Sequence, residues 1–477
     1  MMTASNQHPA PSPFATDVVI VGAGIAGLAT AYELLRRGVS FVVLDRAPRA
    51  GGVILSEEVD GFTIDGGPDA LLIQKPEAIA LCQEIGLGDR LVSTKLPRVA
   101  YIQRGRRLHA LPAASVLGIP TRVGPFLRTS LFSWAGKMRM GAELFIPPRR
   151  DEADESIGAF MTRRFGREAT TYLAEPLLAG IHAGDVDRLS AHALFPRLVD
   201  AERKHGSLLR AFRHRAPSPQ SPAPTSDGAF KSLPGGLSEM VRALLKVLGE
   251  ERIHLNTIVD SIDGDGPFLV RTSTGHAVEA RAVVLATPAF ATSGLTRDRD
   301  AELARLAAEI PYASAATVAL AFRRQDIRHA LTGSGFVVPR VENTGILAAS
   351  WLSSKWPNRA PEDRVLLRTF VGGARDPQAL DRPDKELVAL SLAALRPLIG
   401  LSGDPLFSRV YRWERANAQH EVGHLERMAA IDRALARHPG LFVTGSGFRG
   451  VGIPDCVADG RKTGAQVAEF LKVKSEN

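Results

Sequence analysis

Residues 17–45 read DVVIVGAGIAGLATAYELLRRGVSFVVLD, and this stretch decides the fold class. The apolar run Val18–Val21 predicts a strand that is buried on both faces, as in a parallel sheet. Gly22, Gly24 and Gly27 follow at the GxGxxG spacing. This spacing permits a sharp turn, brings backbone N–H groups close to a pyrophosphate, and lets a helix pack tightly on the strand. The stretch therefore predicts a dinucleotide-binding βαβ unit.

The same unit continues with a helix expected over 25–37, ended by Gly38, and a second strand over 41–44. The free N–H groups and the positive dipole end of this helix face the phosphates. The predicted phosphate-binding residues are Gly22, Ala23, Gly24, Ile25, Ala26 and Gly27. Asp45 follows the second strand, where a carboxylate accepts a hydrogen bond from a ribose 2′-hydroxyl.

Two features bear on which dinucleotide binds. Arg46 follows Asp45, and an arginine there can bind the 2′-phosphate of NADP; an exposed side chain is the simpler interpretation. Residues 49–52 read RAGG. In FAD enzymes of the glutathione-reductase and amine-oxidase type, a similar element follows the first βαβ unit and lies along the flavin. This resemblance favours FAD.

Composition limits the class of protein. The 477 residues suffice for two or three domains, and a mean hydropathy of −0.01 is typical of a globular chain. The net charge is +8, yet no nucleic-acid-binding motif is present, so no nucleic-acid partner is expected. Cys82 and Cys456 share no metal-ligand spacing. They predict reduced thiols, no bound metal and a cytoplasmic location. Residues 1–16 are predicted to be a disordered tail, and no segment reaches transmembrane length.

The middle of the chain combines helical and polar segments. Residues 112–148 mix helical, apolar stretches with Lys137, Arg139, Arg149 and Arg150, which suits a membrane face as well as an ordinary helical subdomain. For His182, a catalytic base and a hydrogen-bonded structural histidine are both open, and the second is commoner. A basic helix over 202–215 is expected to lead into a Pro/Ser-rich mobile loop.

Later segments return to strand patterns. The buried run AVVLATPA (282–289) predicts a strand that rejoins the nucleotide-binding sheet, which makes that domain discontinuous. Strands over 312–322, 335–338, 346–351 and 365–371 suggest a second, antiparallel sheet. Residues 441–471 predict a strand, a glycine-rich loop and a long helix, in which Pro454 suits the first helical position. Gly460 and Gly464 would allow a close neighbour along that helix.

Together these motifs resemble the protoporphyrinogen oxidase-type flavoproteins. The resemblance covers nearly the whole chain and rests on GAGIAG with RAGG, the GGP turn at 66–68, EPLLAGIHAGDVDRLS at 175–190, LPGGL at 233–237, PYAS at 311–314, WPNRAP at 356–361, VGGARD at 371–376, GHLER at 423–427 and GVGIPDC at 450–456. Members oxidise protoporphyrinogen IX to protoporphyrin IX, or in some bacteria coproporphyrinogen III to coproporphyrin III, in heme biosynthesis. They remove six electrons through FAD and use dioxygen as acceptor.

The resemblance implies an α/β architecture: a discontinuous Rossmann-like FAD-binding domain, an antiparallel-sheet substrate domain and a helical subdomain that contacts membranes in some members. The expected boundaries are 17–90, 230–290 and 405–477 for the FAD-binding domain, 91–110 and 291–404 for the substrate domain, 111–215 for the helical subdomain, and 216–229 for the flexible loop.

Site residues also follow from the resemblance. Non-covalent FAD would contact Gly22–Gly27, Asp45, Arg46, Gly51, Gly52, Val53, Gly67, Pro68, Asp69, Ala70, Val259, Trp413, Val451, Gly452 and Ile453. Arg98 would face a substrate propionate, Leu320 and Val337 would sandwich one pyrrole ring, Trp356 would stack on another, and Gly180 would lie near the reacting methylene bridge. No catalytic side-chain dyad is expected, because the flavin carries the chemistry.

The chain departs from the family pattern at several positions. Asp45 stands where Glu is usual and Trp356 where Phe is common, and both changes keep the chemistry. His420 replaces the Tyr of a PQY element and leaves the local packing open. Asp69 and Ala70 weaken any polar contact after the Gly-Pro pair.

Other functions stay open at this point. An amine oxidase or carotenoid desaturase would keep the FAD motifs, and a non-catalytic flavoprotein would keep the glycines. The residues alone do not decide between proto- and coproporphyrinogen as the substrate. They also do not decide whether the chain forms a homodimer or contacts the inner membrane peripherally.

Overall fold

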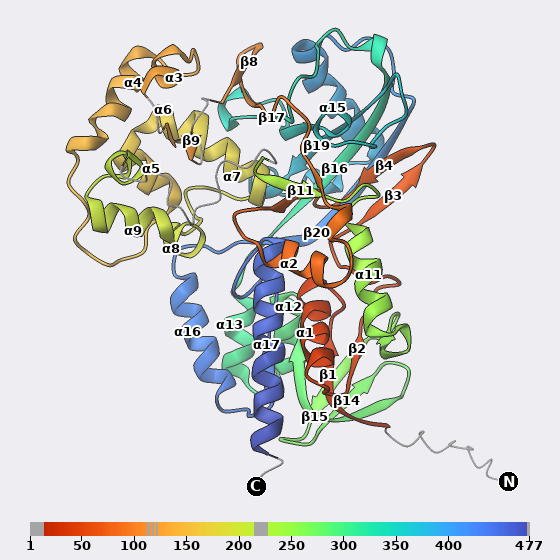
Figure 1. The fold of residues 1–477 in the computed structure, drawn as a ribbon. Coiled ribbons are helices and arrows are strands. Elements are labelled where there is room, and N and C mark those ends of the chain that lie inside the picture. Colours follow the sequence, from red (N-terminus) through yellow and green to blue (C-terminus); the bar gives the residue numbers. More distant parts are fainter. Residues whose placement is uncertain (1–13, 112–114, 117–118, 121–122, 214–227, 475–477) are drawn as a thin grey trace, which may run out of the picture.

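Strand β1 (Phe14–Val21) lies inside a seven-stranded sheet, shown in the lower half of Figure 1. The computed structural model describes residues 14–111, 115–116, 119–120, 123–213 and 228–474. The strand order is β12-β2-β1-β15-β14-β13, and β21 pairs with the second half of β15. The remaining strands are β2 (Phe41–Leu44), β12 (Ile253–His254), β13 (Val259–Asp263), β14 (Phe268–Thr272), β15 (Ala277–Leu285) and β21 (Leu441–Val443). The strand predicted at 282–289 thus belongs to β15 and pairs in parallel with β1.

Both faces of this sheet are covered. Val18 and Ile20 pack on one side with helices α1 (Ile25–Arg36), α2 (Glu77–Glu84), α11 (Ser238–Leu248) and α17 (Ile453–Val473). Val19 and Val21 pack on the other side with the β13–β14 hairpin and helices α12 (Ala289–Thr296), α13 (Ala301–Ala308) and α16 (His424–Leu435). Burial on both faces explains the continuous apolar run of β1.

Helices α1 and α17 run side by side, although they come from opposite ends of the chain (Figure 1). A Cβ atom added at Gly460 would lie 2.3 Å from the carbonyl oxygen of Ala26, and one at Gly464 would lie 2.9 Å from that of Thr30. The Thr30 hydroxyl donates to the Gly460 carbonyl at 3.0 Å. The prediction that these glycines admit a close neighbour is confirmed.

A second seven-stranded sheet has the order β20-β16-β19-β18-β17-β7-β8 and is antiparallel except for the β17–β7 pair. Its strands are β7 (Ala100–Arg104), β8 (Arg107–Ala110), β16 (Tyr312–Arg323), β17 (Gly335–Val337), β18 (Ile346–Trp351), β19 (Arg364–Gly372) and β20 (Phe407–Ala418). Helix α15 (Asp384–Ile399) packs on one face through a core that includes Val318, Leu320 and Leu367. The β3–β4 hairpin (Ser56–Val59, Phe62–Asp65) and helix α14 (Leu352–Lys355) pack on the other face of the second sheet, against Ala319, Ala321 and Leu366. A small separate sheet consists of β5 (Leu71–Leu72), β11 (Phe230–Ser232) and β6 (Val92–Ser93).

The helical region lies at the upper left of Figure 1 and has its own apolar core. It comprises α3 (Val123–Arg128), α4 (Trp134–Gly141), α5 (Ile157–Phe165), α6 (Arg167–Ala169), a π-helical turn η3 (Thr170–Ala174), α7 (Glu175–His182), α8 (Ala191–Leu194), α9 (Pro196–His205) and α10 (Leu208–Arg213). The single helix expected over 202–215 is wrong: α9 ends at His205, because Gly206 adopts a φ of +70° that breaks the helix. None of the helices in the described residues is long and apolar enough to span a bilayer.

The expected boundaries differ from the structure at three places. Residues 14–16 of the predicted tail belong to β1, while residues 1–13 lie outside the described residues. Strand β20 was grouped with the nucleotide-binding segments, yet it pairs with β16 in the second sheet. Helices α12 and α13 were grouped with the substrate segments, yet they pack on the first sheet. The predicted loop at 216–229 lies outside the described residues except for its last two positions.

Candidate cofactor and substrate site

The glycine loop after β1 has the geometry of a phosphate cradle. Gly22 has a φ of +112°, and a Cβ atom there would lie 2.7 Å from the Ala286 carbonyl oxygen. A Cβ atom at Gly27 would lie 2.0 Å from the Gly22 carbonyl oxygen, so helix and turn are in direct contact. At Gly24 a Cβ atom would meet nothing within 4 Å, and no side chain caps helix α1. Open space therefore faces uncapped backbone N–H groups, which fits a pyrophosphate.

Asp45 braces this loop from the next strand. Its Oδ2 atom accepts the Ala23 N–H at 2.6 Å, and its Oδ1 atom accepts the Ala47 N–H at 2.8 Å. Arg46 is exposed, in line with the simpler interpretation of this residue. The Thr257 N–H donates to the Asp45 carbonyl at 2.8 Å, which brings the start of β13 at Val259 close to Asp45.

Two further glycine-containing turns, at 51–53 and 66–68, lie next to the glycine loop. The Gly51 N–H donates to the Ala23 carbonyl at 2.8 Å, and Gly24 and Gly51 form an isolated parallel bridge. Arg49 donates to the carbonyls of Gly52 (2.7 Å) and Ile54 (3.0 Å), which holds the RAGG turn in shape. A Cβ atom at Gly67 would lie 1.9 Å from the Val53 carbonyl oxygen. The predicted segments 51–53 and 67–70 therefore meet beside the GxGxxG loop.

The C-terminal loop completes this edge. Strand β21 ends beside β15, and a Cβ atom at Gly445 would lie 3.9 Å from the Ala26 side chain. Helix α17 then begins after Val451 and Gly452, and Asp455 accepts the Gly452 N–H at 3.3 Å. Lys75 forms an ion pair with Asp455 at 2.6 Å. These segments gather at the carboxyl end of the parallel strands, where open α/β sheets bind their ligands.

A buried ionic cluster behind the GGP turn is the main feature that sequence reasoning missed. The Asp69 carboxylate pairs with Arg368 and Lys355, each at 2.6 Å, and accepts the Trp356 indole N–H at 2.7 Å. Burial alone would raise the pKa of Asp69, but Lys355 and Arg368 hold it well below its usual range. Burial dominates at Asp65 and raises the pKa of that carboxyl despite its ion pair with Arg359 at 2.9 Å.

This cluster shapes the cofactor edge. Arg368 also donates to the carbonyls of Asp65 (2.7 Å) and Gly67 (2.6 Å), and the Trp413 indole N–H donates to the Gly66 carbonyl at 2.9 Å. The turn 66–69 is thereby tied to strands β19 and β20. The sequence predicted that Asp69 weakens polar contact at this turn. Asp69 instead anchors the turn through Lys355, Trp356 and Arg368.

On the predicted substrate side, Gly180 and Val337 lie together. A Cβ atom at Gly180 would lie 3.2 Å from the Val337 side chain and 3.7 Å from that of Ala348. Two other assignments need correction. Leu320 is fully buried on the opposite face of the second sheet, in the core with α15, so it cannot sandwich a ring with Val337. Trp356 is fully buried with Phe62 and Leu352 and bonded to Asp69, so no ring face is free for stacking.

Arg98 lies half-buried beside β6. Its Nε atom donates to the Thr94 carbonyl at 3.1 Å and to the Thr94 hydroxyl at 3.0 Å. Within the ranges that the structure describes, its guanidinium pairs with no carboxylate. Lys95 is exposed on the same turn, and Lys231 of β11 donates to the Ser93 hydroxyl at 3.0 Å. Cations therefore cluster around β6.

Histidines near this edge are neutral. Burial, followed by the charge of Lys75, lowers the pKa of His182 to about 4, and the Gln419 amide donates to the His182 carbonyl at 3.0 Å. Burial and neighbouring His424 lower the pKa of His420 to about 3. His420 fills the place of the expected tyrosine by stacking on His424, with ring centroids 3.8 Å apart.

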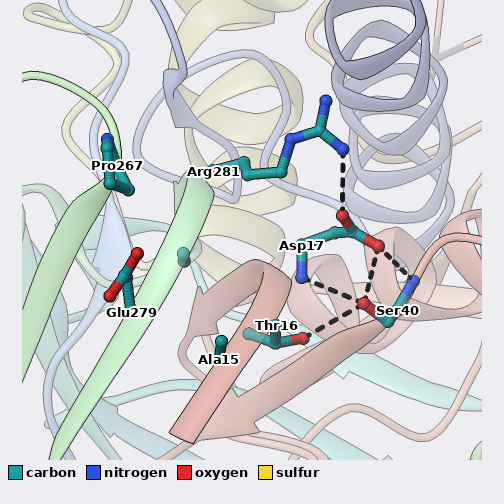
Figure 2. A pocket seen from close by; sticks show the side chains of 8 residues that line it. Ala15, Thr16, Asp17, Ser40, Pro267, Glu279 and Arg281 are labelled. Carbon is teal, nitrogen blue, oxygen red and sulfur yellow. Dashed lines mark hydrogen bonds and ion pairs between the residues drawn. The ribbon is translucent and has the colours of Figure 1, made fainter. Parts of the chain in front are cut away.

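A separate cavity of about 380 Å³ lies at the opposite end of the first sheet, where β1 and β15 begin (Figure 2). Arg281 donates to Asp17 at 3.1 Å there, and the Ser40 hydroxyl donates to Asp17 at 2.6 Å. Asp17, Ser40 and Arg281 thus pair with one another, and the cavity lies away from the glycine loops. Among the described residues, no group of three or more His, Cys, Asp or Glu side chains could hold a metal ion.

A family model described as flavin containing amine oxidoreductase matches residues 25–468. The chain belongs to this family. Its cofactor is FAD, and the open cradle at Gly24 with its uncapped N–H groups fits that dinucleotide.

Named relatives are similar over almost the whole chain. Coproporphyrinogen III oxidase of Bacillus subtilis (strain 168) is 34% identical over 464 residues, covering 95% of this chain and 98% of the relative. The chloroplastic protoporphyrinogen oxidase of Nicotiana tabacum is 28% identical, covering 95% and 86%. A solved structure from Exiguobacterium sp. 255-15, assigned as a protoporphyrinogen oxidase, has 32% identity and a TM-score of 0.84, covering 96% and 99%.

Proposed function

We propose that this chain is an FAD-dependent porphyrinogen oxidase of heme biosynthesis with dioxygen as electron acceptor. The observation that carries the proposal is similarity to porphyrinogen oxidases along 95% of the chain, joined to a fold that gathers the FAD motifs at one sheet edge. Bound FAD supplies the oxidising chemistry. The chain therefore needs to bind the porphyrinogen, orient it and exclude water, and it needs no catalytic dyad.

FAD is held without a covalent bond in this proposal. Gly22–Gly27 would bind the pyrophosphate, Asp45 and Val259 would lie on the ribose side, and residues 451–453 would lie at the flavin end. Burial raises the pKa of Cys82 and of Cys456 to about 12, so neither thiol supplies a thiolate for attachment at neutral pH. Acid precipitation should leave the flavin in the supernatant, and a yellow pellet would contradict this.

The porphyrinogen would lie beside helix α7, next to the place where Gly180 packs against Val337. Arg98 would hold a propionate through its terminal nitrogens, because a guanidinium grips a carboxylate with two parallel hydrogen bonds. Fixing one propionate orients the ring and its reacting carbon.

Coproporphyrinogen III is the proposed substrate. It carries four propionates, whereas protoporphyrinogen IX carries two, and the cations around β6 suit the more anionic ring. The relative from Bacillus subtilis carries the coproporphyrinogen name and is 34% identical, whereas the tobacco protoporphyrinogen oxidase is 28% identical.

The deciding experiment is aerobic turnover of both porphyrinogens by the purified, FAD-loaded chain, followed by porphyrin fluorescence against an enzyme-free blank. We expect faster oxidation of coproporphyrinogen III, with dioxygen consumed in step. No rate above the blank with either substrate would refute the proposed function. Flavin bleaching by primary amines under anaerobic conditions would instead indicate an amine oxidase.

Peripheral contact with an anionic membrane is a further part of the proposal. Trp134, Met138 and Phe145 expose 68%, 70% and 83% of their surface in the helical region, which also carries the exposed Arg128. Of the predicted cations, Lys137 is buried and donates to the Leu127 carbonyl at 2.8 Å, so it does not face outward. Cosedimentation with phosphatidylglycerol vesicles, lost in Trp134→Ser with Met138→Ser, tests the contact. Ultracentrifugation of the same samples measures whether a homodimer forms.

A further inference from the structure

The segment 419–424 links strand β20 to helix α16 and touches two other parts of the molecule. On one side its backbone pairs with the helical region: the Ser190 N–H donates to the His420 carbonyl at 2.9 Å, and the Val422 N–H donates to the Arg188 carbonyl at 2.9 Å. The Gln419 side chain donates to the carbonyl of His182, the last residue of α7, at 3.0 Å. The segment is thus fixed to the helix that carries Gly180.

On the other side, two histidine side chains of this segment reach the C-terminal glycine-rich loop. His420 Nε2 lies 3.0 Å from the Ser446 carbonyl oxygen, and His424 Nε2 lies 2.8 Å from the Phe448 carbonyl oxygen. A carbonyl oxygen only accepts, so both rings carry their proton on Nε2. The rings stack in parallel, with centroids 3.8 Å apart and planes 11° apart, and both are buried.

Ser446 and Phe448 belong to the loop between β21 and α17, which closes the cofactor edge. The loop has little freedom on its remaining sides, because a Cβ atom at Gly447 would lie 2.3 Å from the Tyr312 hydroxyl oxygen. The two histidines therefore hold the loop carbonyls from the side of α16, while Gly445 faces Ala26 at the start of α1.

We infer that His420 and His424 are positioning residues of the FAD site: as a stacked pair, they hold the loop 444–452 at a set distance from helix α7. This inference rests on the proposed placement of FAD at that loop. Neither ring needs to touch the cofactor. Their effect passes through the backbone of the loop, and the same segment ties that backbone to the helix bearing Gly180.

Burial keeps both donors uncharged, with the pKa of each ring lowered. The groups around the pair are His182 on α7, Arg427 and Glu426 on α16, and Asp154 in the helical region. Neutral N–H donors satisfy the two carbonyls without placing a net charge beside the flavin end. A phenylalanine at either position would keep the stacking surface and leave one buried carbonyl without its donor.

The test compares His420→Phe and His424→Phe with His424→Gln, whose amide nitrogen can still donate to the Phe448 carbonyl. Apo-protein is titrated with FAD, and the visible spectrum and midpoint potential of the bound flavin are recorded. We expect each Phe variant to bind FAD about five- to a hundredfold more weakly, with a shifted flavin spectrum and potential. Without FAD the loop moves to give the carbonyl a new partner, and FAD binding must then return it to a position in which the buried carbonyl is unpaired, at a cost of that size. The Gln variant should stay within about threefold of wild type.

His438→Phe is the matched control. His438 lies just beyond the far end of α16 and bonds to Asp300 at 2.9 Å, away from the cofactor edge. This variant should lose thermal stability yet keep the flavin spectrum and FAD affinity. Equal shifts in His438→Phe, or unchanged FAD binding and potential in both site variants, would overturn the inference.

Two provisions keep the result interpretable. If a Phe variant is insoluble, His424→Asn replaces it, since the shorter amide cannot reach the Phe448 carbonyl. FAD affinity and potential do not depend on porphyrinogen turnover. A wild-type chain that binds FAD but oxidises no porphyrinogen would refute the proposed function while leaving this comparison valid.

Discussion

The buried Asp69 cluster gives a prediction whose magnitude follows from its contacts. Both carboxylate oxygens accept from donors: Oδ1 from Arg368 at 2.6 Å, and Oδ2 from Lys355 at 2.6 Å and Trp356 at 2.7 Å. In Asp69→Asn the amide NH₂ would face a cation, and the charge that compensates two buried cations is gone. Removing one partner of a buried ion pair costs about 3–5 kcal/mol. That corresponds to roughly a hundred- to several-thousandfold rise in the unfolding constant.

Urea unfolding followed by tryptophan fluorescence, with and without saturating FAD, measures this loss. Asp404→Asn is the control, because Asp404 and Arg396 form a 3.5 Å pair with side chains 91% and 49% exposed, and it should cost under about 1 kcal/mol. The low pKa of Asp69 means that its stabilisation is present above the unfolded value of about 3.9 and disappears only as the pH falls through the folded value. The difference between wild type and Asp69→Asn should therefore be constant from pH 8 to pH 5. A loss below 1 kcal/mol, or one that shrinks across this range, would refute the reasoning.

Further predictions concern cofactor, substrate and pH. Gly24→Val should abolish FAD binding by filling the open cradle, and retained yellow colour after gel filtration would contradict it. Arg98→Ala should lower kcat/KM for the porphyrinogen about ten- to a hundredfold with unchanged FAD content, whereas the exposed Arg106→Ala should have no effect. NADPH should not bleach the flavin anaerobically, since the sequence has one βαβ fingerprint and FAD would occupy it. Because the pKa of His420 falls to about 3, the unfolded chain binds more protons below about pH 6.5. His420 alone should therefore cost wild type about 2 kcal/mol of its free energy of unfolding between pH 7.5 and pH 5, and His420→Gln should lose about that much less than wild type over this range.

Local sequence information accounted for the βαβ unit well. The strand at 41–44 and the start of α1 at Ile25 are as expected, because turn glycines, the apolar run and the helix are all encoded within 29 positions. The same holds for β18, whose bounds at 346–351 match the prediction. In each case the residues within the segment are sufficient to predict its secondary structure.

The side of a sheet on which a side chain lies, and the contacts between residues far apart in the sequence, could not be predicted in this way. Strand β16 is buried on both faces through its middle, so no alternation tells which side Leu320 occupies, and its placement by resemblance was wrong. The ion pairs of Asp69 with Lys355 and Arg368 join residues almost 300 positions apart, and only the folded sheet brings them together. Strand β20 has few buried side chains, so its pattern did not show that it belongs to the second sheet.

The first sheet cannot be completed until most of the described residues have been synthesised. Its strands come from widely separated parts of the sequence, and β15 pairs with β1 more than 250 positions before it. On the ribosome, β1 emerges well before β15 and β21, so it must wait for them before both its faces can be covered, and α17 follows β21. Until then its apolar surface has no permanent partner, a situation in which nascent chains depend on chaperones. Cofactor loading is therefore expected to follow release of the chain, and deletion of α17 should yield colourless, aggregating protein.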